Sequence, residues 1–120
     1  MRTTAFKKSI AWQKGYILVL EIYKSTDSFP IKERYGLTSQ IRRSASSVVF
    51  NIAEGLLRNT LKELTRFFII SRGSCGELET QLMLAKDLGY ITTEVSDKLI
   101  GQTVEIIRIL NSSIKTLQAK

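Results

Sequence analysis

Histidine is absent from the 120 residues, and cysteine and proline occur once each. Without histidine, the chain lacks the commonest general base, the commonest metal ligand and every Ser-His or Cys-His nucleophile. The single Cys75 excludes an internal disulfide, and its place in an apolar helical repeat predicts a buried packing residue. The longest strictly apolar runs have four residues, whereas a membrane-spanning helix needs about 20. We therefore expect a soluble, cytoplasmic protein that is no enzyme and has no metal, no cofactor and no membrane partner.

Acidic residues are scarce in the first half of the chain. Residues 1–60 contain ten basic and four acidic residues, whereas the second half, with eight and seven, is nearly neutral. A basic half within a chain of pI about 9.8 is typical of proteins that contact phosphate backbones, although a solubilising surface has the same composition. The candidate nucleic-acid-binding residues are Lys7, Lys8, Lys14, Lys32, Arg34, Arg42, Arg43 and Arg58.

Sparse punctuation by proline and glycine predicts long helices. The first spans about residues 9–26, because Pro30 prevents its continuation, and the second follows Gly36 and runs to about residue 56. The third begins with a capping box at Thr60 and Glu63 and ends at a C′ glycine, residue 89. The fourth starts near residue 92. With short turns between them, these helices predict one all-α domain over residues 1–120, an antiparallel up-down-up-down four-helix bundle.

Apolar residues recur at steps of three and four in every helix, which predicts the faces that pack together. The first helix has an all-round apolar run at residues 17–20, which indicates a neighbour in another subunit as well as in its own chain. In the third helix, we interpret Gly73, Ser74 and Gly76 as small residues that let another helix approach. In the first helix, Ile10, Ile17, Leu20 and Tyr23 recur near helical spacing. The predicted inner rows of the other three are Leu37, Ile41, Ala45, Val48 and Ile52; Leu61, Leu64, Phe68, Ser71, Cys75, Leu78, Leu82 and Ala85; and Leu99, Thr103, Ile106, Leu110, Ile114 and Leu117.

A polar stripe follows one face of the second helix beside its apolar row. A solvated face normally mixes lysine and glutamate, so a stripe built from glutamine, serine and asparagine predicts matched hydrogen bonds at a protein interface. We expect two residues of the third helix to lie opposite. The interface or structural stripe is Gln40, Arg43, Ser47, Asn51 and Glu54, with Glu77 and Gln81 facing it.

Two further groups of residues have competing interpretations. The carboxylates of Glu54, Glu77 and Glu79 have the chemistry of a general acid and base, but without a histidine or metal nearby, pairing with Arg43, Arg58 or Arg72 is favoured. The rings of Trp12, Tyr16 and Tyr23 have the chemistry of a base-stacking platform, but their helical spacing favours a place in the core.

Several of these residues together resemble a known family signature. They are Phe29-Pro30, Glu33-Arg34-Tyr35-Gly36-Leu37, Gln40-Ile41-Arg42-Arg43, Ser47 and Asn51 to Gly55, followed by Glu63, Arg66-Phe67, Gly73-Ser74, Glu77-Leu78, Thr80-Gln81-Leu82 and Leu88 to Ile91. The pattern is similar to that of the bacterial four-helix bundle proteins encoded in intervening sequences of 23S rRNA genes. The chain departs from it at Val49-Phe50, where the family commonly has a proline and a small residue.

The resemblance implies a small cytoplasmic bundle that assembles as a homopentameric ring. A similar protein is the accessory factor of the reverse transcriptase of diversity-generating retroelements and contacts nucleic acid. Our hypothesis is thus a non-enzymatic, basic homo-oligomer that binds RNA or DNA through its phosphates. The alternative is an oligomeric scaffold or accessory factor that binds a protein, such as a reverse transcriptase, and no nucleic acid of its own.

Overall fold

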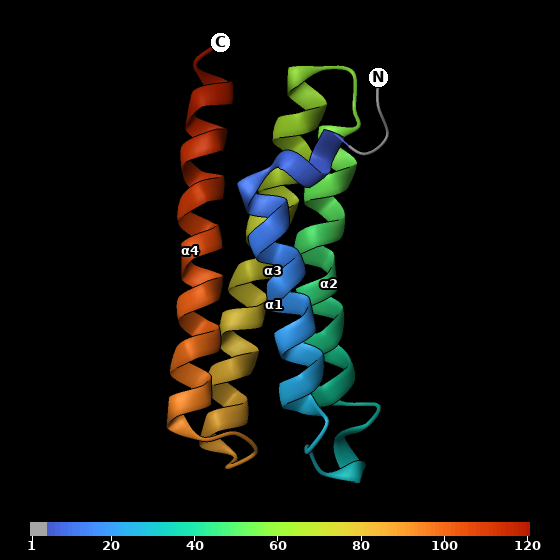
Figure 1. The fold of residues 1–120 in the computed structure, drawn as a ribbon, viewed down its shortest axis with the longest axis vertical. Coiled ribbons are helices and arrows are strands. Elements are labelled where there is room, and N and C mark those ends of the chain that lie inside the picture. Colours follow the sequence, from blue (N-terminus) through green and yellow to red (C-terminus); the bar gives the residue numbers. More distant parts are fainter. Residues whose placement is uncertain (1–4) are drawn as a thin grey trace.

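The computed structural model describes residues 5–120, which form four α-helices, two short 3-10 helices and no strand. The elements in chain order are η1 (Ala5–Lys8), α1 (Ile10–Thr26), η2 (Ile31–Glu33), α2 (Leu37–Leu56), α3 (Leu61–Asp87) and α4 (Thr93–Gln118). They form a rod of about 45 × 25 × 20 Å whose long axis follows the helices (Figure 1). The all-α prediction with four helices is confirmed. In this part of the chain, no helix has the length and apolar character that crossing a membrane requires.

Side-chain caps fix where three of the helices begin, as the sequence predicts. The hydroxyl groups of Ser9, Thr60 and Thr92 accept hydrogen bonds from the amides three residues further on, at 3.1 to 3.2 Å. These bonds pair amides that would otherwise have no partner in the first turn. The carboxylate of Glu63 contacts Arg66 at 3.4 Å. Of the predicted capping box, the described residues therefore contain the bond that the Thr60 hydroxyl accepts from the Glu63 amide. After α3, Gly89 has a positive φ of 80°, which favours glycine and reverses the chain.

The predicted inner rows of α2, α3 and α4 largely form the core. In these rows, the exceptions are Leu61, which is exposed, and Leu64 and Leu117, which are half-buried. Cys75 is buried, as predicted, and burial raises the pKa of its thiol to about 12. Buried hydroxyls of Thr26, Ser71 and Thr103 bond to backbone carbonyls, as Ser71 does to Val48 at 2.7 Å across α2 and α3, whereas those of Thr38 and Ser96 have no partner among the described residues.

The apolar residues that recur along α1 do not face the core of this chain. Ile10, Ile17, Leu20 and Tyr23 are all exposed to between 45 % and 57 %. The row that packs inward contains smaller residues because α1 lies very close to α2: a Cβ on Gly15 would lie 3.3 Å from the Cβ of Val49. The buried residues of α1 are Ala11, Gly15, Leu18, Ile22 and Thr26.

The close-approach role predicted for Gly73 and Gly76 is also wrong within this chain. A Cβ at either position would have no neighbour within 4 Å, and both glycines lie on the exposed face of α3. Only Ser74 of that group is buried, with its hydroxyl 2.8 Å from that of Ser47. The close approach of α2 to α3 is instead at Gly55, where a Cβ would lie 3.0 Å from the Cβ of Phe67.

The four helices differ in length, and the two ends of the rod differ as a result. α1 has 17 residues, whereas α3 has 27 and α4 has 26. At the end of the rod where α2 passes into α3, an open cavity of about 330 Å³ is lined by α2, α3 and α4 and by no residue of α1. Its lining residues are Leu56, Leu64, Phe68, Ser112, Ser113, Thr116 and Leu117.

Candidate nucleic-acid interface

The connection between α1 and α2 is held in place by the side chain of Glu33. One carboxylate oxygen accepts from the amide of Leu37 at 3.1 Å, and thereby caps α2, while the other accepts from the hydroxyl of Tyr90 at 2.8 Å. The bond from the Leu37 amide has the larger effect and, together with the bond from Tyr90, lowers the pKa of Glu33. The bond to Glu33 in turn raises the pKa of Tyr90. Gly36 leaves room for this arrangement, because a Cβ there would lie 2.8 Å from the Glu33 carboxylate.

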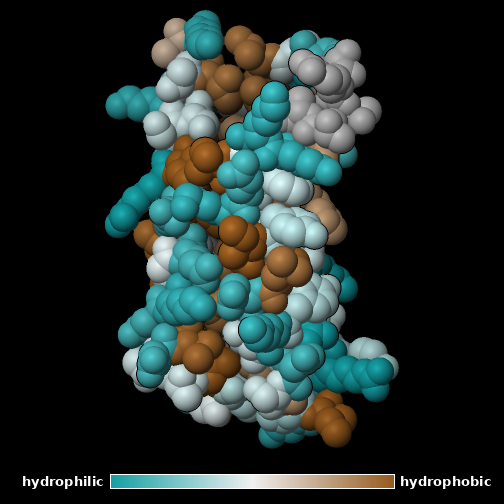
Figure 2. All heavy atoms as spheres, viewed as in Figure 1, coloured by the Kyte–Doolittle hydropathy of each residue, from teal (hydrophilic) through white to brown (hydrophobic). Residues whose placement is uncertain are grey.

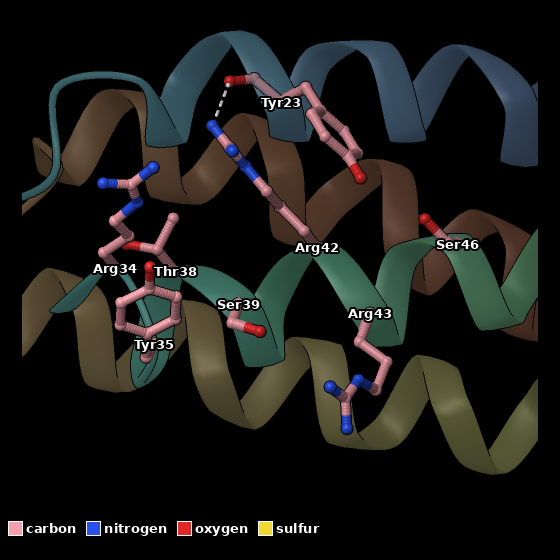
Figure 3. Close-up of a pocket in the computed structure, with 8 residues that line it drawn as sticks. All are labelled: Tyr23, Arg34, Tyr35, Thr38, Ser39, Arg42, Arg43 and Ser46. Carbon is pink, nitrogen blue, oxygen red and sulfur yellow. Dashed lines mark hydrogen bonds between the residues drawn. The ribbon is translucent and has the colours of Figure 1, made fainter.

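Because Glu33 is fastened inward, its neighbours Arg34 and Tyr35 are displayed outward. They border a groove of about 500 Å³ between the end of α1 and the first turns of α2 (Figure 3). Three guanidinium groups, two phenol rings and three hydroxyl side chains line the groove, and no carboxylate does. The lining residues are Tyr23, Arg34, Tyr35, Thr38, Ser39, Arg42, Arg43 and Ser46.

Arg42 is the fixed arginine of the groove. It donates to the hydroxyl of Thr26 at 2.9 Å and to the carbonyl of Tyr23 at 3.3 Å, pairs with Asp27 at 3.2 Å, and lies 4.6 Å from the centre of the Tyr23 ring. Figure 3 shows its side chain crossing from α2 to α1. Since its charge already has a carboxylate partner, Arg42 holds the two helices together more than it offers a free cation.

Arg34 and Arg43 provide the free positive charge. Within residues 5–120, neither forms an ion pair with a carboxylate. Figure 3 shows Tyr35 and Ser39 between these two arginines along the start of α2, with Arg43 directed away from Tyr23. In Figure 3 the two guanidinium groups point apart, so each offers to a separate phosphate a hydrogen-bonding geometry that matches its oxygens.

Two residues of the groove have features that contacts among the described residues do not explain. The side chain of Tyr35 is 88 % exposed, although its backbone is fixed by the capped connection. Thr38 is only 8 % exposed, and its buried hydroxyl oxygen has no hydrogen-bond partner among the described residues. A buried polar group of this kind normally has a partner. Thr38 lines both this groove and an adjoining hollow of about 290 Å³ next to Asp27.

The structure divides the predicted basic residues into three groups. Arg34, Arg42 and Arg43 come together in the groove, and the exposed Lys32 lies in η2 beside it. Two others already have carboxylate partners: Lys14 contacts Glu105 at 3.2 Å and Arg58 contacts Glu54 at 3.1 Å. Lys7 and Lys8 are exposed in η1, at the opposite end of the rod from η2 (Figure 1). The basic residues of the first half thus form no single surface.

The predicted polar stripe lies along the seam of α2 and α3. Its middle is internally bonded, because Ser47 contacts Ser74 and accepts from the side-chain amide of Asn51 at 3.0 Å. Gln40, Arg43, Glu54 and Glu77 are exposed, while the half-buried Gln81 has a buried side-chain oxygen with no partner among residues 5–120. Of the predicted carboxylate pairs, the structure contains Glu54 with Arg58, whereas Arg72 bonds to Asn111 at 3.0 Å.

Sequence reasoning missed part of the groove and misplaced two aromatic side chains. Tyr16 and Tyr23, predicted to lie in the core, are 50 % and 45 % exposed. Tyr35 belongs to the family signature, and nothing in that pattern indicates that its ring is exposed. No signal in the sequence indicates Thr38, because an unpaired hydroxyl is visible only when its neighbours are known.

The fold and the groove define an all-helical bundle with an arginine-rich groove at one end. The chain belongs to the family of 23S rRNA-intervening sequence proteins, whose sequence profile matches residues 7–112. A crystal structure of a protein with unknown function from the S23 ribosomal protein family of Bacteroides thetaiotaomicron is similar, with a TM-score of 0.79 and 25 % identity. The match covers 88 % of this chain and 99 % of that one. A search of the curated proteins finds no match.

Proposed function

We propose that this protein is a non-enzymatic, cytoplasmic homo-oligomer of up-down-up-down bundles that binds RNA or DNA through backbone phosphates. The observation that carries the proposal is the groove at the start of α2, where Arg34 and Arg43 have no carboxylate partner among the described residues and hydroxyl groups lie between them. Contacts of this kind position a nucleic acid with little dependence on its sequence. The antiparallel order is supported by contacts whose residue numbers rise along one helix and fall along the other: Lys14 with Glu105 and Glu21 with Lys98, and Ser47 with Ser74 and Val48 with Ser71.

Self-association is supported by apolar side chains that the chain itself leaves uncovered. Ile10, Ile17 and Leu20 recur on one face of α1 and are each more than half exposed. Figure 2 shows hydrophobic atoms over the middle of α1 within a mostly hydrophilic face. On α3, Gly73 and Gly76 are exposed, and exposed apolar residues both precede and follow them along the helix. Covering these faces with a second copy removes apolar surface from water. The family resemblance favours a pentamer.

The chemistry of the described residues also supports a role without catalysis. Burial holds the pKa of the Cys75 thiol at about 12, so the nucleophilic thiolate is not formed near neutral pH. The lowered pKa of Glu33 belongs to a carboxylate that is occupied in capping α2. No group of residues in the described range has the spacing of a metal site.

The test combines light scattering with fluorescence anisotropy of a labelled mixed-sequence RNA at several salt concentrations. We expect an oligomer whose RNA affinity falls steeply with salt, because binding releases counterions from the phosphates. Replacing Arg34 and Arg43 with Gln should weaken binding and reduce the salt slope by about 1.4, since each phosphate contact on a single strand contributes about 0.7. The matched control replaces the exposed Arg108 and Lys115 of α4 with Gln, which changes the net charge equally and should leave the slope unchanged.

The oligomer has its own variant. Replacing Ile17 and Leu20 with Glu places charges on the uncovered face of α1, and we expect a folded monomer by circular dichroism and light scattering. Ile31→Glu is the control, because Ile31 is more exposed still, at 89 %, and lies outside the α1 face. A wild-type monomer, or RNA affinity that is absent at low salt, contradicts the corresponding half of the proposal.

A protein-binding scaffold is the second candidate, and Phe50 is the observation that favours it. This ring is 68 % exposed on α2, and the described residues do not cover it. A large exposed apolar side chain on an otherwise polar face is typical of a protein-interaction site. An oligomer that ignores RNA but captures a reverse transcriptase, and loses it in Phe50→Ala, would support this candidate over the first.

A further inference from the structure

Folding of the chain does not require the exposed position of the Tyr35 side chain. Its side chain is 88 % exposed, so it contributes little burial. Its backbone, however, is held between the capping bond of Glu33 to Leu37 and the bond of Glu33 to Tyr90. The guanidinium carbon of Arg34 lies 5.5 Å from the centre of the ring. An uncovered ring on a fixed backbone, next to a cation, is a platform on which a base can stack.

Polar groups surround this platform at the positions where a sugar and phosphates would lie. Arg34 and Arg43 flank Tyr35 and Ser39 along α2 (Figure 3), and neither arginine forms an ion pair within the described residues. The groove volume of about 500 Å³ lies within the range of roughly 300–1,000 Å³ found for small-ligand sites.

A duplex does not fit this combination, because its bases are stacked on one another and their faces are covered. A ring such as that of Tyr35 reaches a base face only where the strand is single or the base is turned out of the helix. We propose that the groove holds one nucleotide of a single-stranded RNA or DNA, with its base on Tyr35 and the adjoining phosphates at Arg34 and Arg43. This inference rests on the proposed function and adds to it a preference for single strands.

The test compares three labelled probes at one salt concentration: a mixed-sequence single-stranded RNA, the same strand annealed to its complement, and the same strand with abasic sites. We expect the full-length protein to bind the intact single strand most tightly. Tyr35→Ala should weaken single-strand binding on the order of 5- to 100-fold, the range for loss of one stacked base, and leave duplex binding unchanged. Tyr35→Phe keeps the ring and should bind as the wild type does.

Two further variants separate stacking from other effects. Ile31→Ala removes an equally exposed side chain, 89 % accessible, from the same connection, and we expect no change in affinity. Thr38→Val keeps the shape of the side chain and removes its hydroxyl. We expect no change in single-strand affinity and no loss of stability, since this hydroxyl oxygen is closed to solvent and has no partner among the described residues.

The outcomes distinguish this inference from the function on which it rests. Tyr35→Ala could bind the single-strand and the duplex probe as the wild type does, while the Arg34 and Arg43 variant loses affinity. In that case the stacking site is overturned and phosphate binding stands. Equal weakening of single strand and duplex by Tyr35→Ala also overturns the stacking site. A wild-type protein that binds none of the three probes at low salt overturns both.

Discussion

The connections before and after α2 contain similar residues, an arginine near an aromatic ring, but present them differently. Before α2, Arg34 is free of carboxylates among the described residues and Tyr35 is exposed. After α2, Arg58 pairs with Glu54 at 3.1 Å and lies 4.9 Å from the centre of the half-buried Phe67 ring. Positive charge in a sequence therefore marks a phosphate-binding candidate only where no carboxylate lies within reach. For Arg58, the partner Glu54 lies one helical turn away, a spacing that can be seen in the sequence.

The two connections also differ in what holds them. The connection before α2 depends on side-chain hydrogen bonds from Glu33, whereas the one after α2 depends on backbone packing around Gly55. Hydrogen bonds from a titratable side chain near solvent change with pH, and the side chain can move to make room for a new atom. Close backbone packing is instead sensitive to added side-chain volume. The following three predictions test this difference, from the largest expected effect to the smallest.

Gly55→Ala should destabilise the fold much more than Gly36→Ala. At Gly55 the new Cβ meets the Cβ of Phe67 at 3.0 Å and the carbonyl oxygen of Leu64 at 3.3 Å, so α2 and α3 must separate, at a cost of about 1–3 kcal/mol. At Gly36 it meets only the end of the Glu33 side chain, at 2.8 Å, which can move. Urea denaturation monitored by circular dichroism measures both. An equal loss at the two sites would show that the Glu33 bonds matter as much as the packing.

Ser39→Glu should give Arg43 the partner that Arg58 already has. The spacing from residue 39 to 43 equals that from Glu54 to Arg58, so an ion pair within α2 is expected. Nucleic-acid affinity at low salt should fall about tenfold, because the new carboxylate neutralises one of two free guanidinium groups and repels phosphate. Ser39→Gln is the uncharged control. Unchanged affinity in Ser39→Glu would place the binding surface elsewhere.

Acid should loosen the connection before α2 and spare the start of α3. The pKa of Glu33 is lowered in the folded chain, so its stabilising bonds are present at neutral pH and are lost as the pH falls through that lowered value. The pKa of Tyr90 is raised, so its bond to Glu33 is lost only as the pH rises through that raised value. Hydrogen exchange, corrected for its intrinsic pH dependence, should show falling protection of the Leu37 amide in acid.

The Glu63 amide is the internal reference for this measurement. Its cap is the hydroxyl of Thr60, at 3.1 Å, which does not titrate in this range. Glu33→Gln should remove most of the acid response at Leu37. Parallel loss of protection at Leu37 and Glu63 would indicate global unfolding and would contradict a local role for Glu33.

The helices and most of their inner faces could be predicted from the sequence because both are local properties. Hydroxyl caps at Ser9, Thr60 and Thr92 mark helix starts within three residues of sequence, and the apolar rows of α2 and α4 repeat without interruption. The inner face of α1 could not be found in this way. Its larger apolar residues point outward because Gly15 lets α1 approach Val49 closely, and that contact depends on a helix 34 positions away.

The candidate site could be predicted only in part. Composition pointed to eight basic residues, of which Arg34, Arg42 and Arg43 meet in one groove. The others differ because ion pairs such as Lys14 with Glu105 join residues far apart in sequence. The free hydroxyl of Thr38 is a property of the folded surroundings, and no pattern of residue types indicates it. The segment from Glu33 to Leu37 is part of the family signature. The side-chain bonds of Glu33 in the structure explain why its residues follow one another in this order.

The short first helix implies that local stability is graded along the rod. At about 1.5 Å per residue, α1 is about 26 Å long and α4 about 39 Å. The last turns of α4, around Ser113 and Leu117, therefore have neighbours in α2 and α3 but none in α1, and they border an open cavity. Helical segments with fewer buried contacts open at a lower free energy than the rest of the domain. The C-terminal turns of α4 can thus fray and re-form while the connection that bears Arg34 and Tyr35 stays closed.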